Sequence, residues 1–164
     1  MINRNFRKII NRFSGLHKLK EMKDNVRFKC QKCGFCCRAF PVVATKKEAK
    51  HNKLLIENSK PIIKNLRLLS KKKNECVFLN EKNECDINNS KPILCQTYPF
   101  YYNSKNKKFY YDINCPGIGK GRKINLEKIK NLTLKFENQI SKKELELRYL
   151  LIFEEKIKKE KIKL

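Results

Sequence analysis

The segment CQKCGFCC, at residues 30–37, holds four of the eight cysteines of this chain. Its C-x-x-C-x-x-C-C spacing lets successive thiolates bend round one metal ion or one corner of a cluster, as in zinc knuckles and in iron–sulfur ligation. Gly34 allows the backbone to turn between the thiols, and the cations Lys32 and Arg38 favour the thiolate form. The segment therefore predicts a metal-binding loop.

The other four cysteines are dispersed along the chain. Adjacent cysteines tend to project in different directions, so we expect Cys36 and Cys37 to serve different centres and the eight thiols to form two four-thiolate sites. The alternative is one four-cysteine site with four buried bystander thiols, because cysteine is also a small hydrophobic residue. The predicted metal ligands are Cys30, Cys33, Cys36, Cys37, Cys76, Cys85, Cys95 and Cys115.

Length and composition limit the class of protein. The 164 residues and 19.6 kDa correspond to one domain with tails, which argues against a two-domain enzyme, and 40% hydrophobic residues support a modest core. The first residues lack the apolar stretch of a secretory signal, and no apolar run approaches the roughly 20 residues of a membrane-spanning helix. We therefore expect a cytoplasmic protein. A reducing cytoplasm disfavours disulfides, which leaves metal ligation as the role of so many thiols.

The chain is strongly basic. Lys and Arg number 40 against 16 Asp and Glu, which gives a formal net charge of +24 and an isoelectric point near 9.9. This charge attracts nucleic acid or an anionic surface at low salt. The alternative is a biased composition with solvated lysines. We expect weak, non-specific binding to such partners.

Residues 2–21 predict a basic amphipathic helix. Apolar residues recur there at steps of three and four, with arginine and lysine on the other faces. Such a helix can lie on a membrane or a nucleic acid, or it can dock its apolar stripe on the core. The apolar positions are Phe6, Ile9, Ile10, Phe13 and Leu16.

Capping patterns predict the other helices. T-x-x-E at residues 45–48 is a capping box that starts a helix reaching about residue 57, and S-x-x-E at residues 141–144 starts the last helix. Apolar periodicity predicts a helix at 124–139 between them. A helical turn that carries Cys95 is expected with Pro92 at its first position.

Apolar and aromatic runs separated by polar turns predict hairpins. Residues 76–79 and 85–87 form the arms of one, with a cysteine at the start of each arm. Residues 98–102 and 108–112 form the arms of an aromatic hairpin. Residues 61–69 fit either a helix or a strand.

Known catalytic motifs are missing from the sequence. Gly117, Gly119 and Gly121 follow the last cysteine, but their spacing matches neither a Walker A loop nor a dinucleotide fingerprint. No Ser-His-Asp or Cys-His pair stands at a meaningful spacing. We therefore assign no catalytic residue.

The order and spacing of the cysteine motifs resemble the YkgJ-like cysteine-cluster family, a zinc- or iron-chelating domain. The similar region runs from about residue 28 to residue 121 and includes CQKCGFCC, Lys91-Pro-x-x-Cys95 and Cys115-Pro-Gly-Ile-Gly-x-Gly. Many relatives carry Arg-Pro-x-x-Cys-Arg where this chain has Lys91 and Gln96. The resemblance implies a metal-chelating domain that has often been read as iron–sulfur, and some similar domains occur in flagellin lysine methylases.

These observations predict a single small α+β domain stabilised by metal. Its parts are a basic N-terminal helix in residues 1–27, a cysteine-cluster domain in residues 28–121 and a C-terminal helical extension in residues 122–164. The favoured function is chelation of iron–sulfur clusters or zinc, with iron–sulfur preferred and an electron-transfer or radical role possible. The alternative is a zinc-stabilised module that binds nucleic acid or protein. A protein-modifying enzyme related to the methylases ranks below both, because a four-thiolate zinc site has no open position.

Overall fold

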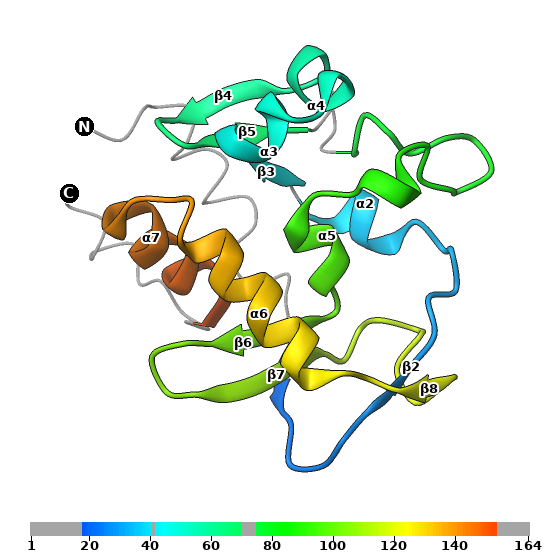
Figure 1. Cartoon of the computed structure of the whole chain (residues 1–164). Coiled ribbons are helices and arrows are strands. Elements are labelled where there is room, and N and C mark those ends of the chain that lie inside the picture. The colour runs from blue at the N-terminus through cyan, green and yellow to red at the C-terminus, as the bar shows by residue number, and fades with distance from the viewer. Residues whose placement is uncertain (1–17, 41, 70–74, 154–164) are drawn as a thin grey trace.

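The computed structural model describes residues 18–40, 42–69 and 75–153 (Figure 1). Three small antiparallel sheets lie among short helices, and two longer helices close the described chain. The predicted α+β class is confirmed. The apolar stripe and basic residues expected at positions 1–17 lie outside the described residues, as does the C-terminal tail from residue 154.

The aromatic hairpin is confirmed as the centre of one sheet. Strands β6 (Phe100–Asn103) and β7 (Lys108–Asp112) pair antiparallel, and β1 (Leu19–Glu21) adds to the other edge of β7. The prediction of a helix through residue 21 is therefore wrong at its last three residues. These residues are extended because their backbone pairs with strand β7, about ninety positions later in the chain.

A second sheet resolves the ambiguous stretch at 61–69. It has the order β3 (Val43–Thr45), β5 (Leu66–Leu68), β4 (Lys60–Ile63), so the stretch is a hairpin and not a helix. β-branched and leucine side chains of this hairpin pack into the core, which favours the strand conformation.

The capping box at Thr45 is confirmed, but the helix that it starts is short. The backbone N–H of Glu48 donates to Thr45 Oγ1 at 3.0 Å, and that of Thr45 donates to Glu48 Oε2 at 2.8 Å. Helix α3 (Lys46–Lys50) then gives way to α4 (Lys53–Glu57), so the single helix predicted through residue 57 is two. The break occurs because the Asn52 side chain accepts from the backbone N–H groups of two following residues and caps α4.

The cysteine-bearing segments are held by short elements. Gly34, at φ 67°, precedes α2 (Phe35–Ala39), which carries two adjacent cysteines. Cys95 lies on α5 (Ile93–Thr97), where Pro92 is the N-cap and not the first helical residue. A short 3-10 helix, η2 (Asn88–Ser90), comes just before it.

The predicted hairpin of residues 76–79 and 85–87 is only partly present. A single bridge joins Leu79 to Cys85, and the backbone N–H of Asp86 donates to Phe78 O at 3.0 Å. The described residues on either side of this bridge form turns and no ladder. The Asn80 side chain accepts from two N–H groups within the loop and stabilises the turn in place of strand pairing.

A third, two-stranded sheet ties the glycine-rich segment to the start of the cysteine cluster. Strand β2 (Arg27–Phe28) pairs with β8 (Arg122–Lys123). Gly121 has φ 71°, and a Cβ there would lie 2.7 Å from Phe28 O. The close approach of the two chains thus requires glycine at this position.

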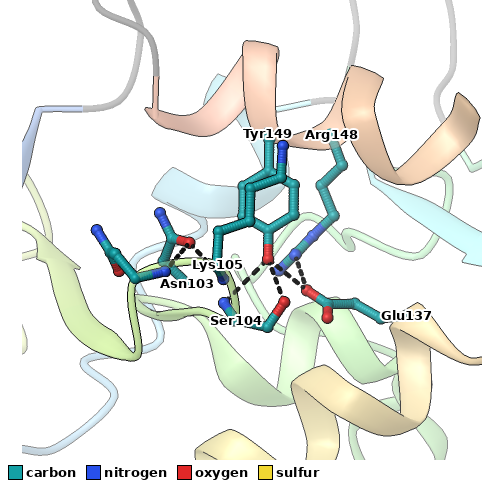
Figure 2. A network of polar contacts seen from close by, with 7 residues as sticks. Asn103, Ser104, Lys105, Glu137, Arg148 and Tyr149 are labelled. Atoms are coloured by element: carbon teal, nitrogen blue, oxygen red, sulfur yellow. Dashed lines mark hydrogen bonds and ion pairs between the residues drawn. The ribbon is translucent and has the colours of Figure 1, made fainter. Parts of the chain in front are cut away.

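Both predicted C-terminal helices are confirmed. Helix α6 (Leu126–Glu137) packs against α5 and β6, and α7 (Lys142–Phe153) follows (Figure 1). The capping box at the start of α7 is formed by reciprocal bonds between Ser141 and Glu144. Figure 2 shows the contacts that fasten α7 to α6 and to the turn between β6 and β7.

Candidate metal centre

One cavity of about 470 Å³ is lined by all eight cysteines. The thiols come from the segment around α2, the loop that follows β5, helix α5 and the loop after β7. None of them forms a disulfide. Folding therefore gathers every thiol of the chain onto the wall of the same cavity.

A first group of thiols lies in the apolar core. It comprises Cys37, Cys76, Cys85 and Cys95. The backbone N–H of Cys76 donates to Cys37 O at 2.8 Å, which brings the loop after β5 against α2. The hydrogen bond from Cys37 lowers the pKa of Cys76, while burial and the nearby thiols oppose this effect.

A second group of thiols lies nearer to solvent. It comprises Cys30, Cys33, Cys36 and Cys115, of which the first two are exposed. Burial raises the pKa of Cys115, and the charges of the other three thiols add to the rise. Pairing of β8 with β2 places the Cys115 loop beside the start of the cysteine segment, where the N–H of Lys29 donates to Gly117 O at 3.2 Å.

The two groups meet at the adjacent cysteines. The Sγ atoms of Cys36 and Cys37 lie 3.9 Å apart, so the expectation that the two side chains project in different directions is wrong. Helix α2 holds both residues on one turn and turns both thiols toward the cavity. The two groups of thiols are therefore adjacent at Cys36 and Cys37.

The described residues contain no preformed metal site of fixed geometry. No three Cys, His, Asp or Glu side chains among them stand together closely enough to hold an ion in this conformation. The donor set nevertheless fits zinc or iron, because both accept several thiolates and eight thiols line one cavity. Binding would require the thiols of each group to move inward.

Burial keeps several of these thiols protonated when no cation is near. It raises the pKa of Cys95, and the charges of neighbouring cysteines add to the rise. The pKa of Cys37 is raised to about 12: the hydrogen bond with Cys36 lowers it, but the bond with Cys76 and burial outweigh that effect. A bound metal ion reverses this balance, because its charge stabilises thiolates directly.

The expected cations lie near the cysteines, and Lys91 joins them. Lys32 pairs with Glu84 at 3.0 Å and interacts with the charge of Cys30, while Arg38 pairs with Glu75 at 3.5 Å and donates to Cys33 O at 3.3 Å. The charge of Lys91 opposes the rise in the pKa of Cys95 that burial causes, and it also opposes the rise in the pKa of Cys36. Sequence reasoning missed this role of Lys91.

One further residue of the cavity wall was not anticipated from the sequence. Arg148 reaches the cavity from α7, whereas Tyr98, from the predicted aromatic hairpin, reaches it from the end of α5. Arg148 stands in no motif with a cysteine, so only its position in the fold could reveal it.

Short helices and hairpins that carry thiols from distant segments to one cavity define a cysteine-cluster domain. A family profile described as "CxxCxxCC: Putative zinc- or iron-chelating domain" matches residues 29–116, which is more than half of the chain. The chain belongs to this family, as its motifs predicted. No curated protein and no solved structure matches it significantly. Within the described residues, none of the helices has the length and apolar character needed to span a bilayer.

Proposed function

We propose that this protein binds zinc or iron in two adjacent centres of four cysteines each. One centre uses Cys37, Cys76, Cys85 and Cys95, and the other uses Cys30, Cys33, Cys36 and Cys115. The observation that carries the proposal is the single cavity lined by all eight thiols. This arrangement makes four bystander thiols the weaker alternative.

The two centres would have different roles. The first is surrounded by buried apolar residues, including Val42, Leu69 and Phe78, so a metal there adds directly to the stability of the core. The second has two exposed ligands and is accessible to a partner or to electron exchange. We favour iron–sulfur at one or both centres, with a redox role for the more exposed one. Free thiols in this number also support a reducing compartment such as the cytoplasm.

A second candidate function is a zinc-stabilised module that binds nucleic acid. The net charge of +24 favours it. In that case both centres would be closed zinc sites with only a structural role.

Metal analysis tests the proposal and separates the two candidates. The full chain is purified without oxygen from cells supplied with iron and zinc, and iron, zinc and acid-labile sulfide are measured per chain. Iron with matching sulfide and visible absorption supports iron–sulfur centres, whereas two zinc ions per colourless chain support the structural module. A chain with far less than one equivalent of either metal would contradict chelation.

A further inference from the structure

The cavity has a polar wall that contains no cysteine. Arg148 and Tyr98 line it together with Tyr101. Burial raises the pKa of Tyr101, and the charge of Arg148 opposes that rise. Burial also raises the pKa of Tyr98, and Tyr101 adds to the effect. Tyr101 is therefore close enough to influence both Arg148 and Tyr98.

Arg148 has an unused donor in this wall. Its side chain is only 7% exposed, and Nη1 donates to Glu137 Oε1 at 2.9 Å. Its Nε–H has no hydrogen-bond partner in the described part of the chain. A buried donor without a partner is unfavourable, so native proteins rarely keep one.

Tyr98 has a second unused group. Its Oη is shielded from solvent and, among residues 18–40, 42–69 and 75–153, has no hydrogen-bond partner. The ring packs against Phe40 with the centroids 5.6 Å apart, which holds the side chain in place. Two unsatisfied polar groups on the wall of one cavity indicate that a bound molecule supplies acceptors.

The charges near Arg148 select the type of acceptor. The Glu137 carboxylate already pairs with Arg148, and Glu144 lies one turn earlier on the same face of α7. The charge of Arg148 is already balanced by Glu137, so a bound anion would bring a second negative charge to this buried guanidinium. An uncharged oxygen can accept a hydrogen bond without that cost.

The rest of the cavity wall near α7 is apolar. Its side chains come from α5, α6, α7 and the β4–β5 hairpin. They are Ile62, Leu66, Leu94, Phe136, Leu147 and Ile152. The volume of about 470 Å³ belongs to the whole cavity, including the part lined by the thiols, and it lies in the range of about 300 to 1,000 Å³ that is typical of small-molecule pockets.

We infer that this part of the cavity binds an uncharged, largely apolar small molecule whose carbonyl-type oxygen accepts a hydrogen bond from Arg148 Nε or from Tyr98 Oη. The apolar body lies against the leucine, isoleucine and phenylalanine side chains. The site does not require the thiols as ligands of this molecule, but it adjoins the second proposed metal centre in the same cavity, because Tyr98 and Tyr101 lie near Cys36 and Cys115.

The test compares three probes of nearly equal size on the full, anaerobically purified chain. Acetophenone carries the uncharged acceptor, ethylbenzene lacks it, and benzoate carries an anion. Calorimetric titration should show acetophenone binding about tenfold more tightly than either of the other two, since about 1.4 kcal/mol corresponds to a factor of ten. Equal affinity for acetophenone and ethylbenzene, tighter binding of benzoate, or no binding of any probe would overturn the inference.

Two variants assign the donors. Tyr98→Phe removes one hydroxyl and keeps the ring, and Arg148→Lys keeps a cation near Glu137 but removes Nε. At least one should abolish the tenfold preference for acetophenone over ethylbenzene, while Tyr110→Phe, on β7 and outside the cavity wall, should preserve it. If both variants kept the tenfold preference for acetophenone over ethylbenzene, the inference would be wrong. Metal content is measured on every sample, so loss of probe binding with full metal content is distinguished from failure of the metal centres.

Discussion

Nη1 of Arg148 lies 2.9 Å from Oε1 of Glu137, and both side chains are 7% exposed. The same glutamate oxygen accepts from Tyr149 Oη at 3.1 Å, and Tyr149 Oη in turn accepts from the backbone N–H of Ser104 at 2.9 Å (Figure 2). Lys105 lies over the Tyr149 ring, 4.6 Å from its centroid. One buried network thus fastens α7 to α6 and to the β6–β7 turn.

Removal of the charge of Glu137 should destabilise the protein strongly. Glu137→Gln leaves the Arg148 guanidinium buried without a counter-charge, and we expect a loss of about 3 kcal/mol in the free energy of unfolding. Urea denaturation measures it. Glu127→Gln on the same helix is the control, because its pair with Lys130 is exposed and should contribute less than about 1 kcal/mol. Similar losses in the two variants would contradict a buried ion pair.

Two tyrosine substitutions should have opposite consequences. Tyr149→Phe removes the hydroxyl that bonds to Ser104 and Glu137, so we expect a loss of about 1 to 2 kcal/mol. Tyr98→Phe removes a buried hydroxyl without a partner in the described chain, so stability should stay the same or rise by up to about 1 kcal/mol. Both are measured by denaturation without added ligand. A larger loss for Tyr98→Phe than for Tyr149→Phe would show that the Tyr98 hydroxyl is satisfied in solution.

The lowered pKa of Glu144 should make the free energy of unfolding decrease as the pH falls. Burial alone would raise the pKa of this carboxyl, but hydrogen bonds from Ser141 and from the side chain and backbone of Asn65 lower it overall. The folded state therefore favours the charged form. Its contribution is complete above the pKa of the unfolded chain and disappears as the pH falls through the lower folded value.

Unfolding measured between about pH 7 and pH 3 checks this prediction. Glu144→Gln should flatten the pH dependence over the acid range and should cost about 1 kcal/mol at neutral pH through the weakened cap. Glu146→Gln, at an exposed position on the same helix, should leave the dependence of the unfolding free energy on pH unchanged. If the Glu144 variant and the wild type lost stability equally between about pH 7 and pH 3, Glu144 would not be the cause of the acid sensitivity.

A serine substitution at one cysteine should remove the metal of one centre and leave the metal of the other centre bound. Cys95→Ser and Cys115→Ser should each reduce bound metal by about half, because a hydroxyl is a poor ligand for soft metals, and the double variant should bind almost none. Elemental analysis of folded protein measures this. Asn89→Ser, an exposed residue beside α5, is the control with the same new side chain. Full metal content in the double variant would rule out both centres.

Binding to polyanions should be weak and sensitive to salt. The four N-terminal arginine and lysine residues, Arg4, Arg7, Lys8 and Arg12, lie outside the described structure but within the predicted basic segment. Affinity for random duplex DNA should fall at least about tenfold between roughly 50 and 200 mM salt. Replacement of all four residues by alanine should make the affinity depend less steeply on salt concentration. Fluorescence anisotropy measures both. Sequence-selective binding that survives the higher salt would instead favour the nucleic-acid module.

Elements that depend on near neighbours could be predicted from the sequence. The capping boxes at Thr45 and Ser141 join residues three positions apart, so their helix starts follow from side-chain chemistry alone. The aromatic hairpin depends on two adjacent runs and the turn between them. The cysteine spacing likewise identified the family and its metal-chelating character.

Only the tertiary structure decided which distant segments meet. Leu19 pairs with Asp112 and is therefore in a strand, although its own segment has helical periodicity. The bond from Cys76 N to Cys37 O brings two thiols together that stand 39 positions apart. Arg148 carries no local signal, and packing of α7 alone places its unused Nε on the cavity wall. Local patterns reflect interactions within a few residues, whereas these contacts depend on how the whole core packs.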